Sequence, residues 1–430
     1  MVTRRSATAF LLVALAASVL AVPQQARAAH DVRFGIKDDA WLLDGPGTIS
    51  SRLDRLQAIG VQVVRFGLRW DEIAPTRPAD AADPNDPAYR WSAFDAVLRG
   101  LHERGIEALV GIWGTPRWAN RGRTPNWIPR RASAVAGFAT AAARRYPWVH
   151  RWLVWNEPNQ RIWLRPTSPK LYVERLLDPA YRSIHRVIHG AQVGGGVTAP
   201  RGGPGGVSPV AWIRGMAKAH ARLDAYAHNP YPLDPRRETP THGVCGSYCA
   251  TITMASLPRL LRDVRRAFGP RARIWLTEYG YQTRPPDPLL GVSPARQALY
   301  LEEAALRAYR APRVDLLIHF LYRDEPQLGG FQSGLTFVDN RPKPALRAFE
   351  LPLAEIGRHG ARVRLWGQLR LPEAARYRLE VYRGHGRWRS LTPWRRTHGR
   401  GYVTWKGALS HGARVRLATA GVHSPALRIR

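Results

Sequence analysis

Short runs of Val, Ile, Leu and Phe recur along the chain every 30 to 50 residues or so, and each is about as long as a strand. The runs are nearly continuous rather than alternating, which is typical of strands buried on both faces of a parallel sheet. They predict strands at residues 32–36, 61–68, 107–113, 152–155, 192–196, 223–228, 273–277 and 315–321.

Amphipathic helical patterns separate these predicted strands. One helix is expected to begin at Ser92 and end at Gly105, and two later helices are expected to begin at Ser256 and at Ser293, which precedes Pro294. Eight strand–helix units within about 320 residues favour an α/β fold of the (β/α)8 (TIM) barrel type over an open sheet. No dinucleotide-type glycine fingerprint follows the first strand, which also disfavours the open sheet.

The pattern changes after residue 350. Short alternating runs separated by Gly, Pro, His and Ser predict a small antiparallel β-sandwich with strands at 362–370, 377–382, 387–391, 401–405, 414–418 and 426–429. We therefore expect a barrel over residues 29–350 and an accessory sandwich over residues 351–430.

The first 28 residues have the pattern of an export signal. Arg4 and Arg5 precede a 14-residue, mainly apolar run (9–22), and Ala26 and Ala28 form a small-x-small cleavage site. The sequence predicts a secreted bacterial protein cleaved after Ala28. A membrane anchor is the alternative, although the apolar run is short for a membrane span.

The two cysteines of the chain, Cys245 and Cys249, lie in one loop. In a secreted protein they are expected to form a small-loop disulfide. A two-thiol metal site is the alternative, but no further cluster of ligands lies nearby in the sequence.

The net charge is +33, from 65 Lys and Arg against 32 Asp and Glu, and +14 of it falls in residues 351–430. A basic surface is typical of nucleic-acid binding. However, only five of the basic residues are Lys, and an excess of Arg with abundant Ala, Gly and Pro is typical of a GC-rich bacterial genome. No recognition helix, zinc spacing or aromatic RNA motif is present, so we expect no nucleic acid. An anionic cell-envelope polymer is a candidate partner of the sandwich, and the oligomeric state is left open.

Two glutamates directly follow apolar strands. Glu157 ends the fourth predicted strand and Glu278 the seventh, at the end of the barrel where active sites form. Burying a carboxylate near a core is costly without partners, so a pair at one barrel mouth points to chemistry. Glycoside hydrolysis needs such a pair, one to protonate the leaving oxygen and one to attack or stabilise the anomeric carbon. A salt bridge to a loop is the alternative for either residue alone.

The sequence Trp-Asn-Glu-Pro-Asn at 155–159, together with Glu278, resembles the clan of retaining (β/α)8 glycoside hydrolases. Within the clan the chain is most similar to glycoside hydrolase family 39, and family 5 (cellulase-like) is a near relative. The resemblance covers residues 31–349, and Arg65, Tyr231 and the pairs 334–335 and 343–344 support it.

The resemblance implies roles for individual residues. Glu157 would be the general acid/base, with a pKa raised partly by the charge of Glu278, the nucleophile. Asn156 would bind the sugar 2-hydroxyl, while Arg65 and Tyr231 would orient Glu278 and keep it ionised. The chemistry implies no cofactor and no metal.

The sequence departs from the family at one point. The family often has His-x-Tyr after the sixth strand, whereas Asn229 stands where that His would fall. His228, one position away, is the candidate to replace it.

Aromatic residues in the predicted mouth loops fit a sugar cleft, because flat apolar sugar faces stack on such rings. We expect Trp118 and Trp163 to be sugar platforms and Tyr322 to line the floor, with loops 75–89 and 229–250 as walls. The alternative for each Trp is packing within a loop. The predicted substrate is a polysaccharide or glycoconjugate, and a non-catalytic carbohydrate- or envelope-binding protein is the alternative function.

Overall fold

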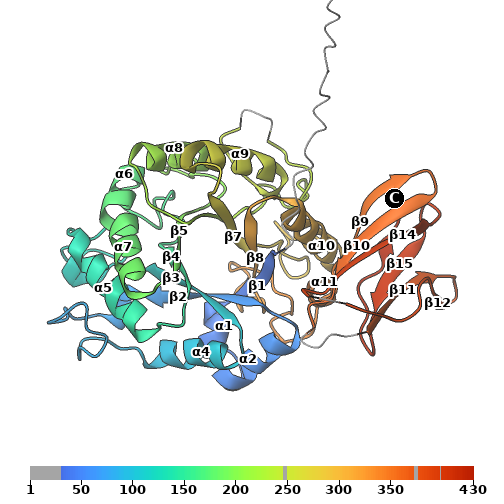
Figure 1. The fold of residues 1–430 in the computed structure, drawn as a ribbon, viewed down its shortest axis with the longest axis horizontal. Helices are drawn as coiled ribbons and strands as arrows, with labels where there is room; N and C mark the ends of the chain where they lie inside the picture. The colour runs from blue at the N-terminus through green and yellow to red at the C-terminus, as the bar shows by residue number, and fades with distance from the viewer. Residues whose placement is uncertain (1–30, 246–248, 372–375, 398) are drawn as a thin grey trace, which may run out of the picture.

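The computed structural model describes residues 31–430 apart from 246–248, 372–375 and 398, so the predicted signal peptide lies outside the described residues. In the described chain, eight parallel strands close into a barrel in sequence order, surrounded by helices (Figure 1). The strands are β1 (Arg33–Lys37), β2 (Val63–Arg69), β3 (Glu107–Trp113), β4 (Arg151–Val154), β5 (Gln192–Thr198), β6 (Ala225–His228), β7 (Arg273–Tyr279) and β8 (Val314–Phe320). The predicted barrel is confirmed.

The three helices predicted from Ser92, Ser256 and Ser293 are present as α4, α9 and α10. Ser293 accepts a hydrogen bond from the backbone of Arg296 at the start of α10, and α4 begins at Ser92. No helix in the described ranges is long and apolar enough to cross a membrane. The α-helices are α1 (Asp39–Asp44), α2 (Ile49–Ala58), α3 (Trp70–Ile73), α4 (Ser92–Glu103), α5 (Ala132–Arg145), α6 (Pro169–Tyr172), α7 (Asp178–Val187), α8 (Pro209–Lys218), α9 (Leu257–Phe268), α10 (Pro294–Arg310) and α11 (Pro344–Glu350), with shorter turns η1 (Arg117–Ala119), η2 (Val173–Leu177) and η3 (Met254–Ser256).

The barrel interior is packed with side chains rather than open. Trp275 of β7 is fully buried in the interior cluster. A Cβ on Gly194 of β5 would lie 2.7 Å from the Trp275 ring, so this strand uses glycine to make room for the indole. With the interior filled, ligands can reach only the barrel ends.

Two antiparallel sheets follow the barrel and confirm the predicted sandwich. One has the order β14–β10–β9, and the other has the order β12–β11–β15–β16, with β13 paired to β11. The strands are β9 (Leu353–His359), β10 (Arg362–Gln368), β11 (Arg376–Tyr382), β12 (Trp388–Ser390), β13 (Arg395–Arg396), β14 (Tyr402–Ala408), β15 (Arg414–Ala418) and β16 (Leu427–Arg428). Strands β9 and β13 were not among the predicted strands. The predicted domain boundaries stay predictions.

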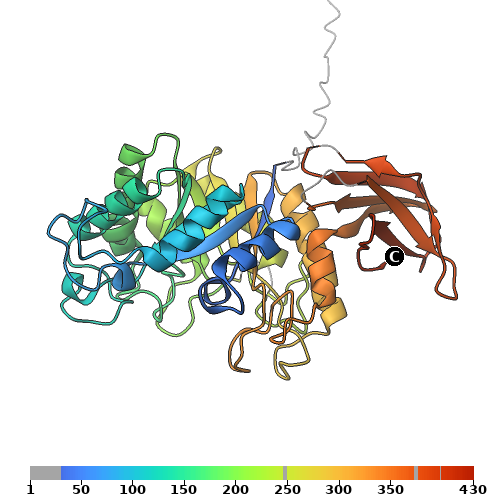
Figure 2. The same ribbon diagram turned by 90° about the horizontal axis from the view of Figure 1, so that it is seen from below.

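The first of these sheets packs against the barrel (Figure 2). The rings of Trp366 and Tyr402 lie 5.3 and 4.7 Å from that of Tyr309 on α10. The guanidinium of Arg370 lies 3.7 Å from the centre of the Phe34 ring of β1 and donates to the carbonyl of Phe349. The sandwich is therefore joined to the barrel by buried contacts.

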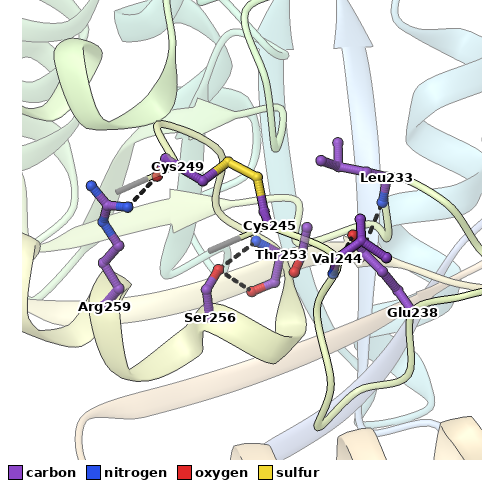
Figure 3. The surroundings of a disulfide bond; sticks show 8 residues. All are labelled: Leu233, Glu238, Val244, Cys245, Cys249, Thr253, Ser256 and Arg259. Carbon is purple, nitrogen blue, oxygen red and sulfur yellow. Dashed lines mark hydrogen bonds between the residues drawn. A yellow bond between two sulfur atoms is a disulfide. The ribbon is translucent and has the colours of Figure 1, made fainter. Parts of the chain in front are cut away.

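The loop between β6 and α9 carries the predicted disulfide. Cys245 and Cys249 are joined, and Arg259 donates a hydrogen bond to the carbonyl of Cys249 (Figure 3). Earlier in the loop, the Glu238 carboxylate accepts hydrogen bonds from the backbone amides of Leu233 and Val244, at 3.1 and 3.4 Å. These contacts fix the loop shape from both ends.

A buried ion pair joins the loops that follow β7 and β8. Lys343 Nζ lies 2.7 Å from Asp324 Oδ1 and 2.8 Å from the hydroxyl of Thr283, and both charged side chains are essentially unexposed. Asp324 is therefore a buried partner of Lys343 and not a solvated loop carboxylate.

We expect Lys343→Met to destabilise the protein by about 3–5 kcal/mol, because it leaves the Asp324 carboxylate buried without its cation. Chemical denaturation would measure the change in the free energy of unfolding. The double variant Lys343→Met/Asp324→Asn should recover part of the loss. If the double variant is no more stable than the single one, the loss does not come from the unpaired carboxylate.

Candidate active site

Glu278 lies at the carboxyl end of β7 and is held by two side chains from other strands or loops. Arg65 of β2 donates from Nη1 to Oε1 at 2.6 Å, and the Tyr231 hydroxyl donates to Oε2 at 3.1 Å. Glu278 is 7% exposed and Arg65 4%. Burial and the neighbouring carboxylates raise the pKa of Tyr231 well above its usual value, so its hydroxyl stays protonated and donates. Glu278 is thus a fixed carboxylate facing the cleft.

Arg65 also fixes the orientation of Asn156. Its Nη2 donates to Asn156 Oδ1 at 2.7 Å, while Nη1 also donates to the carbonyl of Thr277 at 3.1 Å. Because the amide oxygen of Asn156 is occupied by Arg65, its amide nitrogen is the group that Asn156 can offer to a ligand.

Glu157 follows β4 in an unusual backbone conformation. Trp155 and Glu157 have φ angles of 74° and 41°, in the left-handed region that non-glycine residues rarely adopt. The backbone amide of Glu157 donates to Val197 of β5 at 2.9 Å, and the Trp155 indole donates to the carbonyl of Trp163 at 2.8 Å. Strain of this kind, held by surrounding contacts, concentrates at functional sites.

The two glutamates have different electrostatic environments. Burial and the nearby negative charge of Glu278 raise the pKa of Glu157 to about 7, while a hydrogen bond from Asn229 opposes part of that rise. Glu278 instead has the Arg65 guanidinium in contact with its carboxylate. Two carboxyl groups whose environments differ in this way can divide the roles of acid and nucleophile.

Asn229 is a site residue for which the sequence predicted no role. Its Nδ2 donates to Glu157 Oε1 at 3.0 Å, and its Oδ1 accepts from the Thr277 hydroxyl at 2.7 Å. Thr277 thereby fixes the amide so that its donor group faces Glu157. The departure from His-x-Tyr was the available signal, because it placed a polar side chain directly after a barrel strand.

The structure does not bring His228 into the cleft, contrary to expectation. Its Nδ1 lies 2.8 Å from the Thr198 hydroxyl and its Nε2 lies 2.9 Å from the Ile252 carbonyl, and the side chain is fully buried. The carbonyl can only accept, so Nε2 carries the proton. Burial lowers the pKa of His228 to about 4, so the ring is neutral and joins β6 to β5 and the following loop.

A cleft of about 720 Å³ opens around the two glutamates. Arg65, Asn156, Tyr231 and Trp163 line it as predicted, and loop 229–250 forms part of the wall as expected, whereas loop 75–89 does not. Other lining residues include Lys37, Asp39, Trp113, Gln160, Arg201, Leu233, Gln282, Phe320, Glu325 and Phe331.

The structure does not place two of the predicted sugar-contacting aromatic residues, Trp118 and Tyr322, in the lining of the cleft. The Trp118 indole donates to the carbonyl of Ala74, and its ring packs edge-on against Trp70 at 5.8 Å, so it belongs to the loop packing behind the cleft. The Tyr322 ring stacks on Trp41 of α1 at 4.1 Å and is 3% exposed. Both residues follow barrel strands, but their rings pack on other aromatic residues of the protein.

Within the part of the chain that the structure describes, no group of three or more His, Cys, Asp or Glu could hold a metal ion.

Comparison with known proteins shows similarity in fold. No family model matches the chain. A family 39 glycoside hydrolase from Bacteroides cellulosilyticus WH2 aligns over 89% of this chain and 79% of its own, with a TM-score of 0.59 and 17% identity. A glucosidase from Croceicoccus marinus aligns over 91% and 95%, with a TM-score of 0.57 and 17% identity. A GH5_18 protein from Streptomyces cattleya in complex with GlcNAc aligns over 75% and 79%, with a TM-score of 0.52 and 19% identity. The predicted resemblance is therefore confirmed at the level of structure, and these structural relatives are glycoside hydrolases.

Proposed function

We propose that the protein is a retaining glycoside hydrolase that cleaves O-glycosidic bonds of a polysaccharide or glycoconjugate. The observation that carries the proposal is the pair of glutamates. Glu278 is clamped by Arg65 and Tyr231, and Glu157 has a raised pKa beside it in one cleft. A protein that only binds sugars has no need of this division between the two carboxyl groups.

In the first step, a Glu278 carboxylate oxygen attacks the anomeric carbon while Glu157 transfers its proton to the departing glycosidic oxygen. The C–O bond to the leaving group breaks, and an ester forms between the sugar and Glu278. The Asn156 amide nitrogen can donate to a hydroxyl of the sugar during this step, since Arg65 holds its oxygen.

In the second step, Glu157 removes a proton from water, the water oxygen attacks the anomeric carbon, and Glu278 leaves as carboxylate. Esterification of Glu278 removes a negative charge that raises the pKa of Glu157. The pKa of Glu157 therefore falls in the intermediate, which turns the acid of the first step into the base of the second.

The test is hydrolysis of a panel of glycans, with the product anomer followed by NMR during the first minutes of the reaction. The expected result is release of a sugar whose first-formed anomer has the configuration of the substrate. Release of the opposite anomer would exclude Glu278 as nucleophile, and no hydrolysis across the panel would favour the binding function.

We expect kcat/KM to fall as pH rises through about 7. Glu157 must carry a proton to act as acid, and its pKa of about 7 means that the proton is lost above this pH. A pH–rate profile on an unactivated substrate measures this basic limb. A substrate whose leaving group needs no proton should show no such fall in kcat/KM. An equal fall in kcat/KM with both substrates would contradict the assignment of Glu157 as the acid.

Replacement of Asn229 by Ala should move this basic limb to higher pH. The Asn229 hydrogen bond favours the ionised form of Glu157, so its loss raises the pKa of Glu157 further. We also expect kcat to fall by about tenfold. Asn85→Ala, at an exposed loop position, is the control. A limb that moves to lower pH would show that Asn229 does not act through this bond.

We place this hydrolase outside the cytoplasm, after removal of residues 1–28. The Cys245–Cys249 disulfide supports this proposal, because such bonds persist in oxidising compartments. Mass spectrometry of protein from the culture medium should give a mature chain that begins at Ala29. Retention of the intact chain in the cell would contradict it.

A further inference from the structure

The outer sheet of the sandwich, β12–β11–β15–β16, has two chemically different faces. Leu379 and Val381 of β11 and Val415 and Leu417 of β15 are buried in the sandwich core. The residues between them point to the opposite face, because side chains alternate along a strand. The composition of this outward face is therefore set by the residues that alternate with the buried ones along each strand.

We call the outward set the arginine–aromatic face. Strand pairing places Arg376 opposite Arg396, Arg378 opposite Ala418, Glu380 opposite Arg416, and Tyr382 opposite Trp388. The face consists of Arg376, Arg378, Arg396, Arg414 and Arg416, the rings of Tyr382, Trp388 and Trp394, and Glu380. These residues supply five guanidinium groups and one carboxylate, and Arg428 of β16, which pairs with Arg414, adds a sixth guanidinium group on the same side.

Arg378 and Arg416 of this face are held in place by Glu380 and by aromatic rings. Glu380 accepts from Arg378 Nε and from Arg416 Nε, each at 2.7 Å, and is 2% exposed. The guanidinium of Arg378 lies 4.7 Å from the Trp394 ring, and that of Arg416 lies 4.2 Å from the Trp388 ring.

Arg414 likewise lies 4.7 Å from the Tyr382 ring, and Arg376, Arg396 and Arg414 are all exposed. A guanidinium stacked on an aromatic ring keeps its N–H groups in plane, where they can donate in pairs to an oxyanion. Since Glu380 is shared by Arg378 and Arg416, the face retains an excess of positive charge.

The arginine–aromatic face lies on the side of the sandwich away from the barrel. Trp366 and Tyr402 of the other sheet pack on α10, and the second sheet covers that sheet in turn. In Figure 1, β11 and β12 lie at the edge of the molecule farthest from the barrel. Its residues lie along several paired strands, so the face suits an extended ligand.

We propose that the arginine–aromatic face binds an anionic polysaccharide, whose carboxylate or sulfate groups pair with the guanidinium groups while its sugar rings lie over the aromatic side chains. The charge of the face fits a polyanion. The choice of a glycan over another polyanion rests on the proposed function of the cleft. The face would hold the polymer that carries the cleavable bond, or the matrix around it.

The test is binding of the full chain to polygalacturonate, dextran sulfate, neutral dextran and single-stranded DNA, measured by titration calorimetry at several salt concentrations. The face variant is Arg376→Glu/Arg396→Glu/Arg414→Glu, which leaves the Glu380 pairs intact. The control is Arg186→Glu/Arg214→Glu/Arg266→Glu, which changes the net charge equally at exposed positions on the barrel helices.

We expect binding to one or both acidic polysaccharides, none to dextran, and a loss of about tenfold or more in the face variant but not in the control. Equal losses in both variants would overturn the proposal, because the net charge would then explain binding. Tighter binding to DNA than to either acidic polysaccharide, lost in the face variant, would also overturn it. Calorimetry measures binding without turnover. A face that binds no polysaccharide can therefore be distinguished from a cleft that hydrolyses none.

Discussion

Replacement of Glu278 by Gln should reduce turnover by about 10⁴-fold or more on every substrate that the protein hydrolyses. The amide has nearly the same shape but is a far weaker nucleophile, so the ester to the sugar cannot form. The amide oxygen of the new Gln can still accept a hydrogen bond from Arg65. Arg65 also keeps its hydrogen bonds to Asn156 Oδ1 and to the carbonyl of Thr277. Initial rates measure the effect, and a thermal melt checks that the variant is folded.

Glu302→Gln is a matched control for this loss. Glu302 is a buried glutamate of α10 outside the cleft lining, and burial raises the pKa of its carboxyl well above the usual value, which favours the uncharged form that an amide resembles. We therefore expect the amide to have little effect on the rate. If Glu278→Gln keeps a tenth of the activity while Glu302→Gln behaves like the parent, Glu278 is not the nucleophile.

Replacement of Glu157 by Ala should give losses that depend on the leaving group. With an unactivated sugar as leaving group we expect a loss of about 10²–10⁴-fold, because no acid protonates the departing oxygen. A dinitrophenyl glycoside needs no such proton, so its first step should be nearly unchanged. Its second step lacks the base, so the glycosyl ester on Glu278 should accumulate.

The measurement is a pre-steady-state burst of dinitrophenolate, together with a mass increase of one glycosyl group on the peptide that contains Glu278. Glu157→Gln should behave in the same way, since the amide also lacks the acid. Equal losses with both substrates and no burst would show that Glu157 acts in binding rather than in proton transfer.

The barrel could be predicted because its strands are buried on both faces and leave near-continuous apolar runs. Strand β9 could not, because its sequence, LAEIGRH, becomes polar halfway and its second half is largely exposed. Its strand form depends on pairing with β10, which is a tertiary contact that no local pattern records.

The same limit applies to the site. The position of Glu157 and Glu278 in one cleft could be predicted, because both carboxylates follow apolar strands and the carboxyl ends of the barrel strands meet at one mouth. Their catalytic roles stay a prediction. Trp118 and Tyr322 were placed correctly in loops that follow barrel strands. The direction of their rings could not be predicted, because it depends on packing against neighbouring aromatic residues. The role of Asn229 could not be predicted, because it depends on the contact between its amide and Glu157, which exists only in the folded chain.

The position of Arg370 has a consequence for how the protein could be divided. Its guanidinium covers Phe34, a residue of the first barrel strand, and binds the carbonyl of Phe349 at the end of the last helix. The same guanidinium lies 4.9 Å from the centre of the Phe349 ring. A chain that ended at Glu350 would lack Arg370 and leave the rings of Phe34 and Phe349 without this contact, although the repeated strand–helix pattern is complete by then. We therefore expect the C-terminal sheets and the barrel to unfold together, so that heating melts both parts in one cooperative transition.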